Sequence, residues 1–98
     1  MNVNIAKNGD ESVVSVEGRL DTVTAPDLEA SLKELFESTK SLVFDFGKLE
    51  YISSAGLRVL LSAQKTMNKI GTMTVKNVDS SVMEVFEITG FKDILTIE

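Results

Sequence analysis

The 98-residue sequence contains no cysteine and no histidine. Without cysteine there can be no disulfide, no thiol nucleophile and no thiolate metal site. Without histidine there is no imidazole for acid–base catalysis, for a Ser-His-Asp triad or for zinc binding. The 15 carboxylates show no spacing that singles out a pair for general acid–base work. We therefore predict that the protein is not an enzyme and that it uses no metal and no cofactor.

Basic residues and long apolar runs are also scarce. Ten Lys and Arg against 15 Asp and Glu give a net charge of −5, whereas nucleic-acid binding depends on Lys and Arg that neutralise phosphates. No apolar run approaches the roughly 18 residues that span a bilayer. The first residues lack the basic-then-apolar pattern of a signal peptide. We expect a cytoplasmic protein with no nucleic-acid partner and no direct membrane insertion.

The remaining composition is that of a small globular protein. Hydrophobic residues make up 43 % of the chain and charged residues 26 %, unlike the polar, highly charged composition of disordered segments. The length suits one domain, and no linker or repeat interrupts it. We predict a single domain over residues 1–98.

The spacing of apolar residues predicts eight elements. Strands are expected at 3–5, 13–17, 42–46, 72–76 and 94–97, and helices at 24–36, 54–70 and 80–89. The apolar run Leu42–Phe46 is expected to be a central strand covered on both faces. Helices that alternate with strands imply a mixed sheet with right-handed crossovers. The predicted fold class is α/β, a small mixed β-sheet flanked by helices.

Residues at the element boundaries predict turns and caps. Asn8-Gly9 is expected to supply the positive φ angles of a tight hairpin. Thr24 followed by Asp27 has the spacing of a capping box. Gly71 fits the position that follows a helix.

Ser53 and Ser54 stand at the predicted start of the second helix. One interpretation is an N-cap, in which a hydroxyl accepts a backbone N–H and contributes about 1 kcal/mol. The other is a phosphate acceptor, because the N–H groups and the positive dipole end of a helix favour an anion. The two are compatible, and the residues leave both open. Gly56 costs roughly 1 kcal/mol inside a helix, which calls for an explanation such as the close approach of another backbone.

The second helix is basic although the chain is acidic. Residues 54–71 contain Arg58, Lys65 and Lys69 but no Asp or Glu. Lys65 and Lys69 suit the negative C-terminal end of the helix dipole. Arg58 does not, because it lies four residues after Ser54 on the same helical face. It is a candidate for contact with an acidic partner or with a phosphate on Ser54.

The chain resembles the STAS domain of bacterial anti-sigma factor antagonists along nearly its whole length. The resemblance rests on the order and spacing of several segments: Gly18-Arg19-Leu20-Asp21 followed by Ala25-Pro26, then Leu42–Phe46, Tyr51–Leu61, Ile70-Gly71 and Val85–Ile94. It implies the STAS fold, in agreement with the mixed sheet and flanking helices predicted from the residues.

The resemblance also implies a function in transcription regulation. Unphosphorylated members of the family bind an anti-sigma factor, typically a serine kinase, and so release a sigma factor. The kinase phosphorylates a serine at the start of the second helix, and a PP2C-type phosphatase reverses this. Alignment of Gly56-Leu57 with the family motif places the acceptor at Ser54, with Ser53 as the less favoured candidate. Ser53 departs from the motif, since Asp is usual at that position.

The resemblance further implies a partner-binding surface around the acceptor. Its residues are Asp21, Ser53, Ser54, Ala55, Gly56 and Arg58. From the residues alone, Asp21 is equally open to interpretation as a turn or capping residue.

A second use of the same fold is the alternative. A small soluble STAS subunit of a lipid-transport or transporter assembly would dock an ATPase or a permease through its helix surface. Phosphorylation of Ser54 by a kinase distinguishes the regulatory function from this alternative.

Overall fold

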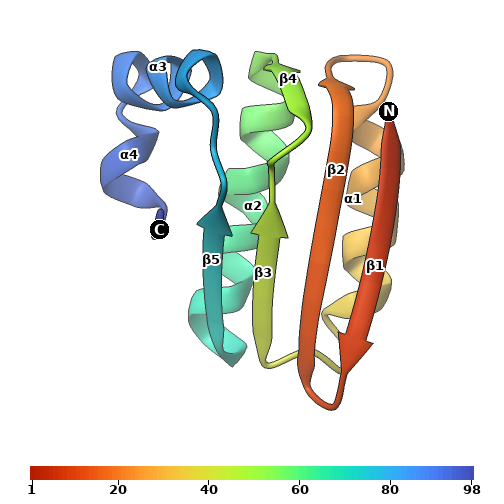
Figure 1. The fold of residues 1–98 in the computed structure, drawn as a ribbon. Coiled ribbons are helices and arrows are strands. Elements are labelled where there is room, and N and C mark those ends of the chain that lie inside the picture. Colours follow the sequence, from red (N-terminus) through yellow and green to blue (C-terminus); the bar gives the residue numbers. More distant parts are fainter.

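The computed structural model describes all residues from 1 to 98 and contains a single sheet with helices packed against it (Figure 1). The elements follow the chain as β1 (Asn2–Asn8), β2 (Glu11–Leu20), α1 (Ala25–Leu35), β3 (Ser41–Asp45), β4 (Leu49–Ile52), α2 (Ser54–Ile70), β5 (Thr72–Lys76), α3 (Ser80–Thr89) and α4 (Phe91–Ile94). The strand order is β1-β2-β3-β5, and β4 pairs with β2. Only β1 is antiparallel to its neighbour. The predicted α/β class and mixed sheet are confirmed, and β4 is an additional strand that the apolar spacing did not indicate.

The hairpin between β1 and β2 forms as predicted. The two strands pair without interruption from Asn2 opposite Glu17 to Asn8 opposite Glu11. Gly9 has a φ of +66° in the turn between them, a conformation that glycine adopts without steric cost. Asn8 is the last residue of β1, so only one residue of the predicted Asn-Gly pair has a positive φ.

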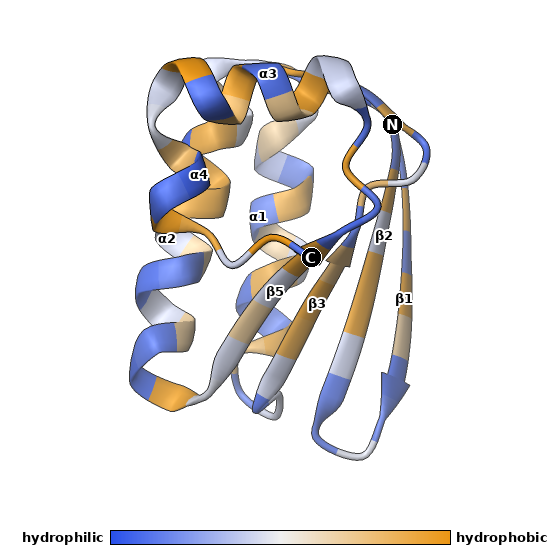
Figure 2. Ribbon diagram, turned by 60° about the vertical axis from the view of Figure 1, so that its left-hand side comes forward, coloured by the Kyte–Doolittle hydropathy of each residue, from blue (hydrophilic) through white to orange (hydrophobic).

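One face of the sheet carries α1 and α2, and the opposite face is open (Figures 1 and 2). Leu42 and Phe44 of β3 are fully buried toward the helices. Val43 points the other way and is only half-buried, next to Val13 of β2. The prediction that both faces of this strand are covered is therefore wrong. The chain steps from β2 through α1 to β3 and through α2 to β5 in one direction, so right-handed crossovers place both helices on the same face.

Thr24 precedes α1 but does not cap it. Its side chain makes no capping hydrogen bond; instead its hydroxyl donates to the backbone carbonyl of Arg19 at 2.9 Å. The same oxygen accepts the backbone N–H of Asp21 at 2.9 Å. The capping-box prediction is wrong because the hydroxyl of Thr24 bonds to Arg19 and Asp21, which precede it, and not to the first turn of the helix.

The C-terminal segment differs from the predicted strand at 94–97. Phe91–Ile94 form the short helix α4, and only Ile97 makes a single parallel bridge to Val75 of β5. Gly90, with a φ of +81°, ends α3 and lets the chain turn directly into α4. Phe91 and Ile94 are three residues apart, which is helical spacing, and Leu95 is the residue that this turn buries.

The helix α2 spans 17 residues and ends against the loop that precedes β3. A Cβ atom on Gly71 would overlap the backbone carbonyl oxygen of Lys40, and the same carbonyl accepts the N–H of Thr72 at 2.9 Å. Gly71 has an extended φ of 174°, so close packing, rather than a left-handed turn, requires glycine here. None of the helices combines the length and the hydrophobicity that a membrane span requires.

We predict that Gly71→Ala lowers the free energy of unfolding by roughly 3 kcal/mol, because the new methyl group must displace the Lys40 carbonyl. Gly90→Ala is the matched control. A Cβ there meets nothing within 4 Å, so its cost is that of a left-handed alanine, about 1 kcal/mol. Urea denaturation followed by circular dichroism measures both values, and equal losses in the two variants would contradict the packing argument.

Candidate functional site

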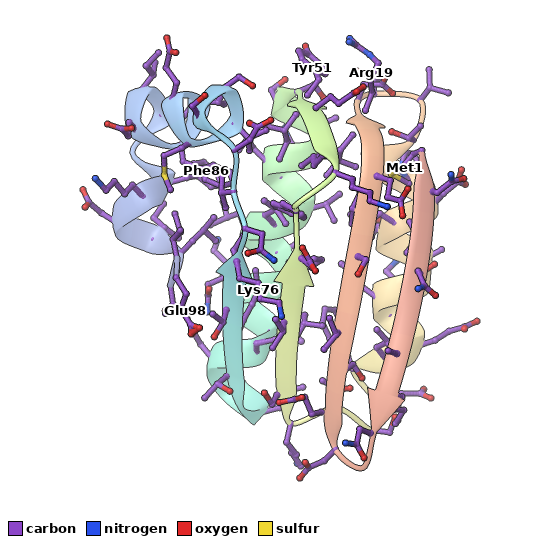
Figure 3. The ribbon with its side chains drawn as sticks, viewed as in Figure 1. Met1, Arg19, Tyr51, Lys76, Phe86 and Glu98 are labelled. Carbon is purple, nitrogen blue, oxygen red and sulfur yellow. The ribbon has the colours of Figure 1, made fainter.

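Parallel pairing between the ends of β2 and β4 brings two distant loops together. Arg19 lies opposite Tyr51 and Leu20 opposite Ile52. Directly after this pairing, the N–H of Ser53 donates to the carbonyl of Leu20 at 2.9 Å. The loop that follows β2 therefore runs beside the start of α2, and both lie at the upper end of the sheet in Figure 3.

The two serines at the start of α2 have different positions. Ser53 is the N-cap residue, with an extended backbone and a half-buried side chain whose Oγ accepts the N–H of Gly56 at 3.4 Å. Ser54 is the first helical residue and its side chain is exposed. The capping function thus belongs to Ser53, and the hydroxyl of Ser54 is accessible at the surface.

The environment of Ser54 favours a negative group. The Ser53 cap satisfies one of the first-turn N–H groups, and the others point out of the helix end. The first turn of α2 contains no acidic residue. The positive end of the helix dipole is therefore not neutralised by a side chain of the helix itself.

Gly56 lies beneath the predicted partner-binding surface and not on it. The residue is buried, and a Cβ there would lie 2.8 Å from Leu20 Cγ and 2.8 Å from Ile52 Cγ1. Its small size lets α2 pack directly on the paired ends of β2 and β4. This explains the helical glycine and corrects its assignment to the surface. The close neighbours of Gly56 are side chains and not another backbone, which corrects that expectation.

Asp21 organises the loop after β2. Its Oδ1 accepts the N–H of Val23 at 3.0 Å and the N–H of Thr24 at 3.1 Å. The bond from Thr24 is the main reason that the pKa of Asp21 lies below its ordinary value of 3.8, although desolvation opposes the shift. The stabilisation from this loop is therefore complete at neutral pH and is lost as the pH falls through the lowered pKa. These contacts are those of a turn residue, as one interpretation of Asp21 expected. The other carboxylate oxygen, Oδ2, lies 3.9 Å from Arg19 Nε.

Ala55 and Arg58 complete the predicted surface. Ala55 is half-buried, and Arg58 is exposed and makes no ion pair. Both line a hollow between the starts of α1 and α2, whose other walls are Thr22, Ala25, Pro26, Glu29 and Val59. The structure thus gathers Asp21, Ser53 and Ser54 at one end of the molecule, and places Arg58 one turn further along α2.

Comparison with known proteins identifies the family. The model of the STAS domain matches residues 2–98. The chain belongs to the STAS domain family. The match covers both the loop after β2 and the start of α2.

Several curated relatives of this STAS domain are anti-sigma factor antagonists. The anti-sigma-B factor antagonist of Bacillus subtilis is 31 % identical over 98 residues, which cover 99 % of this chain and 90 % of the relative. BtrV of Bordetella bronchiseptica, which carries the name of an anti-sigma factor antagonist, is 36 % identical over 87 residues, which cover 87 % of this chain and 75 % of the relative.

Solved STAS structures share the same architecture. An anti-sigma factor antagonist from Mycobacterium paratuberculosis has a TM-score of 0.89 and 27 % identity, covering 98 % of this chain and 83 % of its own. SpoIIAA in its unphosphorylated form has a TM-score of 0.80 at 14 % identity, covering 99 % of this chain and 87 % of its own. At that low identity the likeness to SpoIIAA concerns the fold alone.

Three further residues of this STAS domain frame the site and were not predicted. The guanidinium of Arg19 stacks over the ring of Tyr51, 4.1 Å from its centroid, at the top of Figure 3. Tyr51 is 41 % exposed and Val23 is 82 % exposed. Exposed Tyr, Arg and apolar side chains are typical of protein interfaces. Val23 is the single apolar residue between Asp21 and Thr24, which was the available sequence signal, but only the β2–β4 pairing brings its loop beside the start of α2.

We predict that Ser53→Ala lowers the free energy of unfolding by about 1 kcal/mol, because it removes the N-cap hydrogen bond to Gly56. Ser54→Ala is the control, since it removes an exposed hydroxyl and should change stability by less than about 0.5 kcal/mol. Urea denaturation of the two variants measures the difference. A larger loss for Ser54→Ala than for Ser53→Ala would mean that the capping assignment is wrong.

Proposed function

We propose that this STAS domain is an anti-sigma factor antagonist controlled by phosphorylation of Ser54. In the unphosphorylated state it binds a cognate anti-sigma factor of the serine kinase type, and a sigma factor is released. The kinase transfers phosphate to Ser54 and so ends the interaction, and a PP2C-type phosphatase restores it. The observation that carries the proposal is the exposed hydroxyl of Ser54 at the positive end of α2, next to a cap function already taken by Ser53.

The relatives favour this function over a transport subunit. The Bacillus subtilis relative is named an anti-sigma-B factor antagonist, and this chain covers 90 % of its length. SpoIIAA, which shares the fold, is described in both unphosphorylated and phosphorylated forms. A protein with this fold thus exists in a phosphorylated form, which supports the proposal that this chain accepts a phosphate.

The physical effect of the phosphate is local. Phosphorylation adds a charge of about −1.5 to −2 at pH 7, and the N–H groups at the start of α2 can hold it without refolding of the helix. Asp21, whose lowered pKa keeps it ionised, lies on the neighbouring loop. Two anionic groups on one contact surface repel an acidic partner, and an apolar partner must desolvate both of them, which weakens binding by a few kcal/mol.

Ser53 in place of the usual Asp preserves the cap and changes the charge. Ser and Asp are comparable N-cap residues, so the start of α2 is retained. The residue before the acceptor is neutral in this chain, and the kinase therefore meets one negative charge fewer. The Arg19–Tyr51 stack and Val23 provide the apolar contact area around the acceptor.

We predict that incubation with the cognate kinase and ATP places one phosphate on Ser54, and that Ser54→Ala abolishes this incorporation. Ser54→Asp should reduce the affinity for the kinase at least tenfold while the circular dichroism spectrum stays unchanged, because the new charge disturbs the contact surface and not the fold. Mass spectrometry and isothermal titration calorimetry provide the measurements.

A variant of the neighbouring serine is the control for phosphorylation of Ser54. Ser53→Ala should still accept phosphate on Ser54. Phosphate on Ser53 alone, or native affinity of Ser54→Asp, would overturn the proposed switch. Absence of phosphate together with co-purification of an ABC ATPase would favour the transport subunit.

A further inference from the structure

The exposed face of α2 carries positive charge only. Arg58, Lys65 and Lys69 are all exposed, and none of them forms an ion pair. No Asp or Glu lies between Ser54 and Gly71. The helix carries +3 in a chain of net charge −5, so the other residues together carry −8. This concentration of charge needs a physical explanation.

The three basic residues and Ser54 lie along one side of the helix. At about 100° per residue, Ser54, Arg58, Lys65 and Lys69 fall within a sector of roughly 60°, and they extend over about 22 Å at 1.5 Å per residue. We call Arg58, Lys65 and Lys69 the basic stripe. A shallow groove of about 310 Å³ follows the stripe, lined in addition by Leu61, Ser62 and Thr66. The groove therefore begins one turn from the candidate acceptor.

The helix dipole does not account for the whole stripe. Lys69 lies in the last turn of α2, where a cation is favourable. Arg58 is the fifth residue of α2, in its second turn, where the dipole gives a cation no stabilisation. An unpaired, exposed arginine at that position is better explained by an external anionic partner. Its position on the walls of both the basic groove and the hollow beside Ala55 makes the stripe continuous with the candidate site.

We propose that the basic stripe docks an acidic segment of the anti-sigma factor, and that phosphorylation of Ser54 acts partly by cancelling the charge of this stripe. The inference rests on the proposed function, because it takes its occupant from there: a protein that must reach Ser54 necessarily approaches the N-terminal end of the stripe. The groove offers three cationic positions, with Leu61 between Arg58 and Lys65 and Thr66 between Lys65 and Lys69. This suits a segment that carries carboxylates about one helical turn or two apart.

The charge of the phosphate is comparable to that of the stripe. A group of about −1.5 to −2 at Ser54 reduces the net charge along this side of α2 from +3 to about +1. Electrostatic attraction mainly raises association rates and is screened by salt. The phosphorylated protein should therefore associate more slowly with its partner and show a weaker dependence of the rate on ionic strength.

The test compares two double charge reversals of equal net change. Lys65→Glu/Lys69→Glu alters the stripe, whereas Lys7→Glu/Lys92→Glu alters exposed lysines on β1 and α4. Stopped-flow association with the cognate kinase in 50 mM NaCl should be at least tenfold slower for the stripe variant and less than threefold slower for the control. The difference should shrink below twofold in 500 mM NaCl. Equal rates for both variants would overturn the stripe as a docking surface and leave the proposed switch intact.

A second measurement does not depend on the kinase. Titration of the ¹⁵N-labelled protein with a deca-glutamate peptide should shift amide resonances of residues 58–69, and the stripe variant should lose these shifts while Lys7→Glu/Lys92→Glu keeps them. If the kinase does not bind the native protein, the proposed function is wrong. The peptide titration then tests by itself whether the basic stripe binds an acidic segment. Absence of shifts in α2 overturns the inference.

The same variants distinguish two other occupants of the basic groove from an acidic protein segment. Binding to vesicles of phosphatidylserine and phosphatidylcholine without binding to deca-glutamate would assign the stripe to a membrane surface and overturn the proposal. A dimer in sedimentation equilibrium that dissociates in Lys65→Glu/Lys69→Glu would assign it to a second copy of the chain, again against the proposal.

Discussion

The short parallel pairing between the ends of β2 and β4 is the constraint on which the site depends. It joins residues 18–20 to residues 49–52 and so fixes the loop of Asp21 beside the start of α2. Gly56 makes this possible, because any side chain there would collide with Leu20 and Ile52. A helix held this closely by the sheet keeps the first-turn residue Ser54 at the surface in a defined orientation, so that a modification can act without refolding.

The charges around the site are concentrated on one side of α2. The helix dipole, the uncompensated first turn and the basic stripe all place positive potential along the exposed side of α2. The candidate acceptor lies at the end of that side, and the ionised Asp21 lies next to it on the loop after β2. Under the proposed function, a phosphate at this point would be held by the N–H groups of the helix start and would change the electrostatic field that a partner meets. Tolerance by the fold combined with a large effect on binding is what a reversible switch requires.

The errors of prediction arise from contacts and connections that lie outside the predicted element. Thr24 has the sequence position of a capping residue, but its hydroxyl donates to the carbonyl of Arg19 instead. Leu42–Phe46 has the composition of a strand covered on both sides, yet two crossovers in one direction leave one face open. Ile94 has the β-branched character of a strand residue, but the turn at Gly90 carries it into α4. A neighbouring bond, the sheet topology and a turn thus outweighed the preference of the residues themselves.

The sequence by itself determined the α/β class, the hairpin, the three long helices, the basic character of α2 and the candidate serines, because these depend on periodicity, glycine positions and charge along the chain. Only the tertiary structure decided which serine caps the helix, that Gly56 is buried, and that Arg19, Tyr51 and Val23 frame the site. These properties depend on which segments pack together, and residues about 30 positions apart become neighbours only when β2 and β4 pair.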